Sequence, residues 1–147
     1  MLQPNYAAQG KALRILIVED YGLTQLQISR TLILSGYDVV GKARTGSEAI
    51  VLAEDLMPDI ILMDVNLPGN IDGIDATSRI MKNTIAYCPI IIIVTAYNEP
   101  DLVEQATRAG ALRYLLKPLT SEQLLASIQC CLTEREVKQT GQSVECL

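Results

Sequence analysis

The chain has 147 residues, of which 49% are hydrophobic and 20% are charged, a composition typical of one soluble globular domain. Its 12 basic and 17 acidic residues give a formal net charge of −5, so no excess of positive charge is available to neutralise a nucleic-acid backbone. The sequence contains no histidine, which excludes a histidine phosphocarrier, a histidine general base and a histidine-ligated metal site from this chain.

The sequence also lacks the features of a membrane or secreted protein. No apolar run approaches the roughly 20 residues that a membrane-spanning helix needs, and the first residues do not follow the pattern of a secretory signal. The cysteines at 88, 130, 131 and 146 show neither a metal-binding nor a disulfide-framework spacing, so reduced thiols are expected. We therefore expect a cytoplasmic protein that binds neither membranes nor nucleic acid directly.

Five short apolar segments alternate with stretches of helical periodicity along the chain. In chain order the apolar segments read LRILIVED, DVVGKA, DIILMD, IIIIVTA and LRYLLKP. This alternation is typical of an α/β fold, in which right-handed crossovers place helices on both faces of a parallel sheet. The stretches that follow the apolar segments predict helices at Leu23–Leu34, Ser47–Ala53, Gly73–Lys82, Asp101–Ala109 and Ser121–Thr133.

Helix-terminating and helix-capping residues support these boundaries. Gly36 ends the first helix, Pro58 stops the second helix before the third strand, and Gly110 ends the fourth. Thr120, followed three residues later by Gln123, predicts a capping box at the start of the last helix.

The organisation predicted from these elements is a single domain. It spans residues 13–135, preceded by an N-terminal extension at 1–12 and followed by a C-terminal tail at 136–147.

Polar side chains stand at the ends of four of the five predicted strands. They are Glu19 and Asp20 after the first strand, Asp64 after the third, Thr95 after the fourth and Lys117 after the fifth. In an open parallel sheet, ligands bind beyond the carboxyl ends of the strands, where the strand order reverses. Three carboxylates gathered there would repel one another without a cation, and a donor set made only of oxygens matches Mg²⁺.

Asp64 is the candidate nucleophile of this group. A carboxylate can attack phosphorus to form an acyl phosphate, with Lys117 supplying a positive charge and Thr95 a hydroxyl donor. Taken singly, each residue has a plainer explanation: Asp20 as a helix N-cap, Lys117 as a solvated lysine, and Thr95 as a hydroxyl at a strand end. Their coincidence at the tips of otherwise apolar strands favours the functional interpretation.

Four segments of the chain, in this order, resemble the receiver domain of response regulators. They read ILIVEDYGLT, IILMDVNLPGNIDGID, IIIVTAY and GALRYLLKPL, within a resemblance that covers about residues 13–133. The resemblance implies a flavodoxin-like, doubly wound sheet of five parallel strands in the order 2-1-3-4-5, with five helices.

The same resemblance assigns roles to the polar residues. It implies that Asp64 is the phosphoacceptor, that Thr95 and Lys117 bind the phosphoryl oxygens, and that Mg²⁺ or Mn²⁺ is the cofactor. The implied metal ligands are the carboxylates of Glu19, Asp20 and Asp64 and the backbone carbonyl of Asn66.

Further residues are assigned by resemblance around this centre. Thr95 and Tyr114 form the expected switch, in which Tyr114 swings inward when Thr95 moves toward the phosphoryl group. The bond before Pro118 is expected to be cis. Asn66 and Tyr97 occupy variable positions that flank the acceptor, and Tyr97 is expected to shield the phosphoryl group from water. The loop after Asp64 is one residue longer than in the usual receiver pattern, which leaves its geometry open.

The expected function is that of a response regulator in a two-component system. Its partner would be a sensor histidine kinase or phosphotransfer protein, and it would catalyse only its own phosphorylation and dephosphorylation. We expect a stand-alone receiver without a DNA-binding output domain. A downstream protein would contact the fourth helix, fifth strand and fifth helix, and a homodimer through the same surface is an alternative. Candidate contact residues on that surface are Val103, Arg108, Arg113 and Tyr114.

The sequence also bears on three other possible functions. A phosphohydrolase of the haloacid dehalogenase type would carry a DxD pattern with its nucleophile after the first strand, whereas Glu19 and Asp20 are adjacent and Asp64 follows the third. A flavodoxin-like nucleotide binder would need a glycine-rich phosphate loop, which EDYGLT does not supply. A receiver-shaped adaptor that is never phosphorylated remains open from the sequence.

Overall fold

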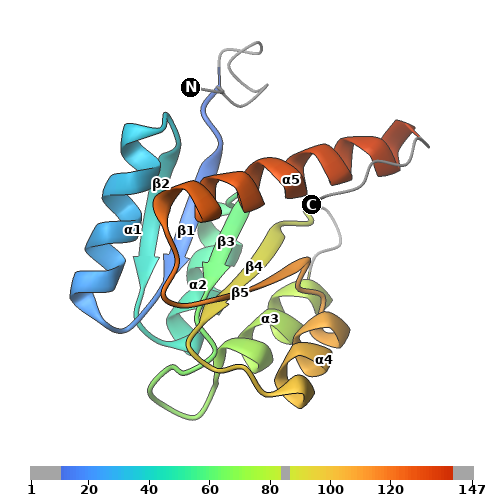
Figure 1. Cartoon of the computed structure of the whole chain (residues 1–147). Coiled ribbons are helices and arrows are strands. Elements are labelled where there is room, and N and C mark those ends of the chain that lie inside the picture. Colours follow the sequence, from blue (N-terminus) through green and yellow to red (C-terminus); the bar gives the residue numbers. More distant parts are fainter. Residues whose placement is uncertain (1–10, 84–86, 141–147) are drawn as a thin grey trace.

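The structure is a computed structural model, and it describes residues 11–83 and 87–140. Strands and helices alternate throughout this part of the chain (Figure 1). The strands are β1 (Arg14–Val18), β2 (Asp38–Ala43), β3 (Ile60–Met63), β4 (Ile90–Thr95) and β5 (Arg113–Leu116). The helices are α1 (Gly22–Leu34), α2 (Gly46–Leu56), α3 (Gly73–Lys82), α4 (Pro100–Ala109) and α5 (Ser121–Thr140).

The strands form one parallel sheet in the order β2-β1-β3-β4-β5, which confirms the predicted fold class. The order reverses between β1 and β3, because the chain passes outward from β1 to β2 and then returns to β3. The two strands are paired from Ile15 with Ile60 to Val18 with Met63, so they end level with each other. Whatever follows Val18 and Met63 therefore meets at the reversal point.

Helices cover both faces of the sheet, and this explains the unbroken apolar sequence of β3. Ile60 and Leu62 belong to the hydrophobic cluster under α1 and α5, whereas Ile61 and Met63 belong to the cluster under α2, α3 and α4. These side chains are at most 2% exposed. A strand buried on both faces needs apolar residues at every position, and its tight packing fixes where it ends.

Capping interactions fix the ends of several helices. The Thr45 hydroxyl accepts a hydrogen bond from Glu48 N at the start of α2, and Gly110, at φ 113°, ends α4 in the left-handed region. The predicted capping box of α5 is confirmed, because Thr120 N donates to Gln123 Oε1 and Gln123 N donates to Thr120 Oγ1. Helices α2 and α5 both run further than their sequence patterns predict.

The cysteines agree only in part with the expectation of reduced thiols. Cys88 and Cys131 are free, and burial of Cys131 in the core raises the pKa of its thiol to about 11. Cys130 is instead disulfide-bonded, so the expectation was wrong for this residue. Sequence spacing does not reveal which cysteines approach each other in space.

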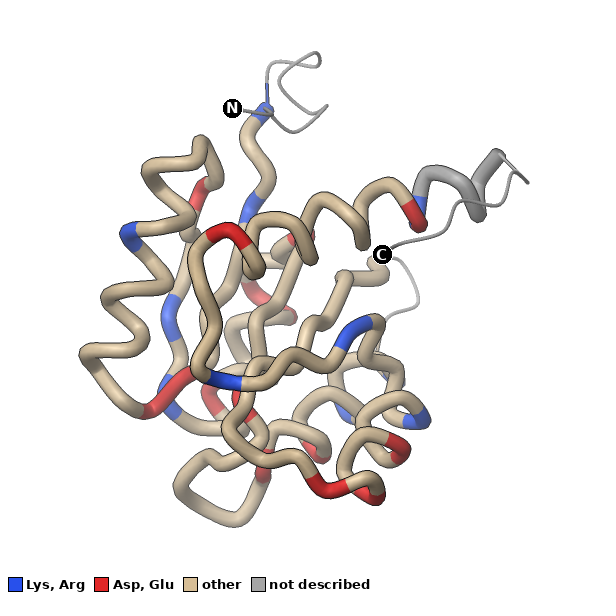
Figure 2. The backbone as a smooth tube through the Cα atoms, in the orientation of Figure 1, with Lys and Arg blue, Asp and Glu red and all other residues tan. Residues whose placement is uncertain are grey.

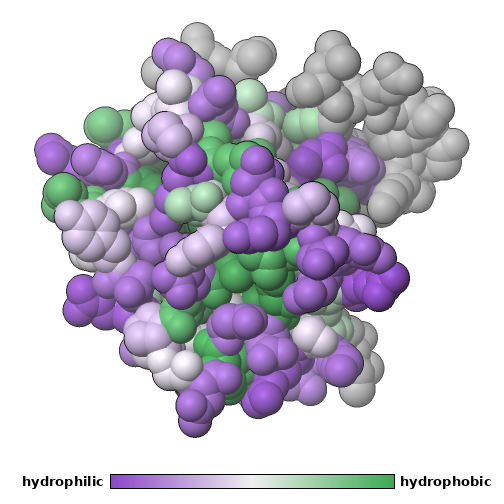
Figure 3. All heavy atoms as spheres, turned by 60° about the horizontal axis from the view of Figure 1, so that its bottom comes forward, coloured by the Kyte–Doolittle hydropathy of each residue, from purple (hydrophilic) through white to green (hydrophobic). Residues whose placement is uncertain are grey.

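Across the described ranges, no helix combines the length and the apolar character needed to cross a bilayer. Many of the acidic residues lie in the lower half of the molecule in Figure 2, which in Figure 1 contains α3, α4 and the loops near the ends of the strands. In Figure 3, which brings this edge forward, hydrophilic residues frame a hydrophobic central area.

Candidate functional site

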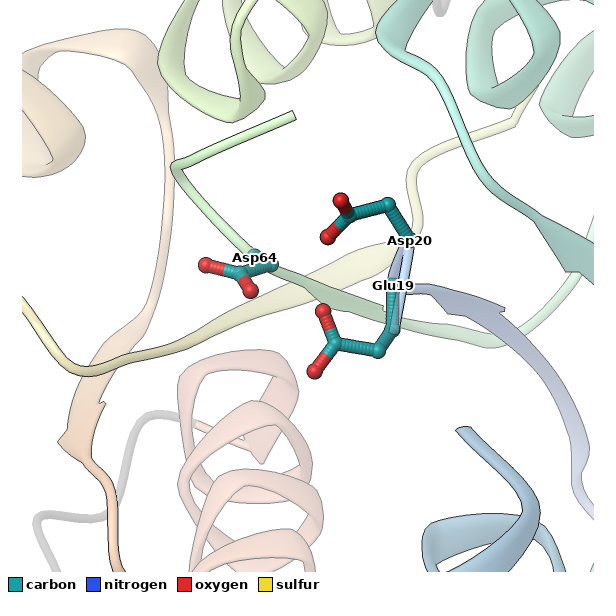
Figure 4. A group of neighbouring side chains, drawn as sticks. All are labelled: Glu19, Asp20 and Asp64. Atoms are coloured by element: carbon teal, nitrogen blue, oxygen red, sulfur yellow. The ribbon is translucent and has the colours of Figure 1, made fainter. Parts of the chain in front are cut away.

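The predicted acidic cluster lies at the reversal point of the sheet. Glu19 and Asp20 follow β1, Asp64 follows β3, and Asp64 N donates a hydrogen bond to Val18 O at 3.0 Å. The three side chains point into a common space (Figure 4), and each offers a carboxylate oxygen within 4.8 Å of the other two. The structure thus brings together all three carboxylates that the sequence indicated.

Lys117 supplies a positive charge to the same space. Its Nζ lies 2.5 Å from Glu19 Oε1 and 3.0 Å from Asp64 Oδ2, so one ammonium group bridges both carboxylates. The lysine follows β5, and its bond to Pro118 is cis, as predicted. This geometry places a cation directly beside the candidate nucleophile.

The Asp64 carboxylate is held through both of its oxygens. Lys117 Nζ donates to Oδ2, and Asn66 N donates to Oδ1 at 3.2 Å. Burial alone would raise the pKa of Asp64, which is 8% exposed, but hydrogen bonding with Glu19 and Lys117 and the charge of Lys117 lower it overall. Asp64 is therefore ionised at neutral pH, as a nucleophile must be.

Lys117 keeps its proton for the complementary reason. Burial disfavours its charged form, but hydrogen bonds to Glu19 and Asp64 and the negative charge of Asp64 raise its pKa overall. The ammonium therefore remains charged at the pH at which Asp64 is ionised.

Glu19 is the carboxylate of the cluster whose ionised form is disfavoured. Its side chain is 3% exposed, and burial, followed by the neighbouring Asp64 carboxylate, raises its pKa to about 7 although Lys117 acts in the opposite direction. Glu19 Oε2 is buried and has no hydrogen-bond partner within the part of the chain that the structure describes. A buried carboxylate oxygen without a donor, beside two further carboxylates, fits a divalent cation as the missing partner.

The raised pKa of Glu19 predicts how stability depends on pH. In metal-free protein the free energy of unfolding should fall as the pH rises from 4.5 to about 7, by on the order of 3 kcal/mol. Stability falls with rising pH because Glu19 binds its proton more tightly in the folded than in the unfolded chain, and this stabilises the fold at low pH. The lowered pKa of Asp64 acts below 3.8, outside this range.

Urea denaturation across this pH range, in chelator and in Mg²⁺, measures the effect. Mg²⁺ should flatten the fall, because a cation favours the ionised carboxylate, and Glu19→Gln should remove the part due to this residue. An unaltered slope in Glu19→Gln would show that another group is responsible.

The two predicted switch residues are joined through a third. Thr95, which is fully buried at the end of β4, accepts a hydrogen bond at Oγ1 from Tyr97 N at 3.5 Å. The Tyr114 hydroxyl donates to Tyr97 O at 2.7 Å. The sequence indicated Tyr97 only as a shield, because a link through the backbone leaves no trace in side-chain pattern.

Gly73 is a site residue that the sequence indicated only as the start of a helix. Its N donates to Val65 O at 2.9 Å, and a Cβ atom placed on it would lie 1.8 Å from the backbone oxygen of Asp64. No side chain fits there. The only signal in the sequence is the Asp72-Gly73 pair at the end of the loop.

The chain matches the family model described as response regulator receiver domain over residues 15–129. It is 42% identical over 125 residues to the transcriptional regulatory protein PdtaR of Mycobacterium tuberculosis H37Rv, an alignment that covers 84% of this chain and 59% of the relative. It is 33% identical over 115 residues to the chemotaxis protein CheY of Thermotoga maritima, covering 78% of this chain and 93% of that protein. The chain therefore spans about 59% of the length of PdtaR.

Solved structures similar to this chain point to the same family. The signal receiver domain of a modulated diguanylate cyclase from Desulfovibrio desulfuricans G20 has a TM-score of 0.78 and 31% identity, covering 87% of this chain and 99% of that one. A CheX-CheY-BeF3-Mg complex from Borrelia burgdorferi has a TM-score of 0.81 and 26% identity, covering 88% of this chain and 96% of that one. The chain belongs to the response regulator receiver domain family of two-component signalling systems.

Proposed function

We propose that this chain is the phosphoacceptor of a two-component pathway and takes a phosphoryl group onto Asp64. The observation that carries the proposal is the Lys117 ammonium group, which lies 3.0 Å from Asp64 Oδ2 and 2.5 Å from Glu19 Oε1. The donor would be the phosphohistidine of a sensor histidine kinase or phosphotransfer protein, since this sequence contains no histidine.

In the proposed reaction a carboxylate oxygen of Asp64 attacks the phosphorus atom. A P–O bond forms and the P–N bond of the donor breaks, and its electron pair stays on the imidazole nitrogen of the donor. The product is an acyl phosphate on Asp64. Lys117 would balance the negative charge of the phosphoryl oxygens, and the Thr95 hydroxyl would donate a hydrogen bond to one of them.

A divalent cation would be held by the carboxylates of Glu19, Asp20 and Asp64 and by the backbone carbonyl of Asn66. Mg²⁺ or Mn²⁺ bound there would supply positive charge opposite the phosphoryl oxygens. The unpartnered Oε2 atom of Glu19 supports this assignment. Asn66 N already bonds to Asp64, so the residue lies beside the cluster.

The signal would leave the site through the link between Thr95 and Tyr114. A Thr95 hydroxyl that turns toward the phosphoryl group gives up its hydrogen bond from Tyr97 N. Tyr114, whose hydroxyl is bonded to the other side of the same residue, would then be free to move inward.

The surface formed by α4, β5 and α5 is the proposed output face. Two candidate contact residues there are already paired, Arg108 with Glu104 at 2.5 Å and Arg113 with Glu134 at 2.9 Å. Arg108 and Glu104 are largely exposed, so their pair contributes little to stability and leaves the guanidinium accessible to a downstream protein.

Tyr97 provides a prediction about the lifetime of the modified state. Its side chain is 42% exposed on the loop that follows Thr95, where it would cover the phosphoryl group. Tyr97→Ala should shorten the lifetime of the acyl phosphate severalfold, as measured by loss of the phosphoryl mass after removal of the donor. Tyr97→Phe, which keeps the ring, should retain the wild-type lifetime. An unchanged or longer lifetime in Tyr97→Ala would refute the shielding role.

Incubation with acetyl phosphate and Mg²⁺, followed by intact-mass measurement, tests the proposed function. The wild-type chain should gain one phosphoryl unit, and neither Asp64→Asn nor wild type with excess chelator should gain it. No gain in wild type would favour a receiver-shaped adaptor that is never phosphorylated. A gain that persists in Asp64→Asn would place the acceptor elsewhere.

A further inference from the structure

We infer that Gly46, the first residue of α2, is a positioning residue for the loop between β3 and α3 and thereby for the backbone carbonyl of Asn66. The inference rests on the proposed metal site, in which that carbonyl is a ligand. Gly46 belongs to a different element from the acidic cluster and offers no side chain, so it acts only through the loop.

The atom of this loop that a side chain on Gly46 would meet first is a backbone atom. A Cβ atom on Gly46 would lie 2.4 Å from the backbone oxygen of Ile71, 3.0 Å from its carbonyl carbon and 2.8 Å from its Cγ2. Real Cβ atoms essentially never approach other heavy atoms within 3.0 Å. A backbone oxygen cannot rotate aside as the end of a side chain can, so either the loop or α2 would have to move.

Helix α2 is the better fixed of the two. Its first turn is capped by Thr45, whose hydroxyl accepts from Glu48 N at 3.1 Å. Ala49 and Ala53 on the same helix are at most 2% exposed and pack against the sheet. Moving the helix would disrupt this packing, so the loop is the part that yields to a side chain at position 46.

A displacement of Ile71 would reach Asn66 through a shared hydrophobic cluster. Ile71 packs against the cluster that buries Val65 and Leu67, the two residues on either side of Asn66. The far end of the loop cannot absorb the movement, because Gly73 N is bonded to Val65 O. Gly46 thus contacts the loop at Ile71 and Gly73 is bonded to it at Val65, and Asn66 lies between these two residues.

The position of one carbonyl matters because Mg²⁺ requires near-octahedral ligands at about 2.0 to 2.1 Å. A shift of a few tenths of an ångström in the Asn66 carbonyl should therefore weaken binding. Gly46→Ala should reduce Mg²⁺ affinity about tenfold, the size of effect typical when a group that orients a metal ligand is altered.

Gly41→Ala is the matched control. Its Cβ atom would lie 2.8 Å from Leu56 Cδ1 and 3.2 Å from Leu16 Cδ1, which are the flexible ends of side chains, and Gly41 lies on β2. Both substitutions crowd the packing of α2 against its neighbours. Only the one at Gly46 should change the loop.

The experiment compares backbone amide chemical shifts of residues 65–72 in metal-free protein and then titrates Mg²⁺ into wild type, Gly46→Ala and Gly41→Ala. We expect shifts in this loop and weaker Mg²⁺ binding for Gly46→Ala alone. Unchanged loop shifts and unchanged affinity in a folded Gly46→Ala protein would overturn the inference, and so would equal losses in both variants.

If Gly46→Ala does not fold, Ile71→Ala tests the step by which the loop position reaches Asn66, because it removes side-chain atoms that pack against the cluster around Val65 and Leu67. It removes Cγ2 and keeps the glycine, and it should also lower Mg²⁺ affinity about tenfold; an unchanged affinity would overturn the inference. If the wild-type chain does not bind Mg²⁺, the proposed function loses its metal site, whereas the metal-free loop shifts still decide the role of Gly46.

Discussion

Replacement of Gly73 by alanine is expected to destabilise the fold by about 3 kcal/mol, the upper end of the usual range for overpacking, and to suppress phosphorylation of Asp64. The added Cβ atom would lie 1.8 Å from the backbone oxygen of Asp64, 2.7 Å from its carbonyl carbon and 2.9 Å from Val65 Cα. All three are backbone atoms of the segment that carries the candidate nucleophile. The start of α3 and the end of β3 must separate, which displaces Asp64 from Lys117.

Gly22→Ala is the matched control, because Gly22 is also the first residue of a helix. Its Cβ atom would meet only Arg44 Nη2, at an ordinary distance of 3.5 Å. Alanine there should leave stability unchanged or raise it by up to about 1 kcal/mol through helix propensity. Urea denaturation and acetyl phosphate labelling should separate the two variants. Equal stability and labelling of Gly73→Ala and Gly22→Ala would contradict the close packing beneath Asp64.

Loss of the positive charge at Lys117 should have the largest effect on the chemical step. Lys117→Met should slow phosphorylation of Asp64 by about a hundredfold to a thousandfold, the loss typical when one group that stabilises developing charge is removed. The same change leaves Glu19 and Asp64 without their bridging cation, so the folded chain should also lose stability at neutral pH.

The rate of mass gain with acetyl phosphate and saturating Mg²⁺ measures the effect of Lys117→Met. Lys42→Met is the control, since Lys42 is an exposed lysine on β2 and should be replaced without effect on the rate. Labelling of Lys117→Met at the wild-type rate would remove Lys117 from the proposed mechanism.

The polar groups at the strand ends could be predicted because a parallel sheet brings the carboxyl ends of its strands to one edge. Glu19, Asp20 and Asp64 needed no more than the alternation of apolar and helical segments to be placed together. Resemblance to a family supplied the cis bond at Pro118 and the strand order. Both kinds of inference depend on side chains or motifs that are visible in the sequence.

Contacts made by backbone atoms could not be predicted in the same way. The space above Gly73 is set by the backbone of Asp64, which belongs to a different element, and Tyr97 connects Thr95 to Tyr114 through its own N–H and C=O groups. Neither arrangement requires a particular side chain at the partner position. The disulfide of Cys130 was missed for a related reason, because pairing depends on distance in space rather than on spacing along the chain.

The directions of the pKa shifts could not be predicted from the sequence either. Sequence places three carboxylates near a lysine, but it does not say which one is most buried. The pKa of Glu19 rises because its side chain is buried, whereas that of Asp64 falls because hydrogen bonding with Glu19 and Lys117 outweighs the effect of its own burial. Burial and hydrogen bonding therefore separate two carboxylates of one cluster, Glu19 with a raised pKa and Asp64 with a lowered one.

The most direct test of the central proposal is to trap the phosphorylated residue chemically. Borohydride reduces an acyl phosphate to an alcohol, so chain treated with acetyl phosphate and Mg²⁺ and then with borohydride should contain homoserine in place of Asp64 alone. Peptide sequencing by mass spectrometry locates the change. A reduced residue at Asp20 or Glu19, or phosphorylated chain that yields no homoserine at position 64, would contradict the assignment of Asp64 as the acceptor.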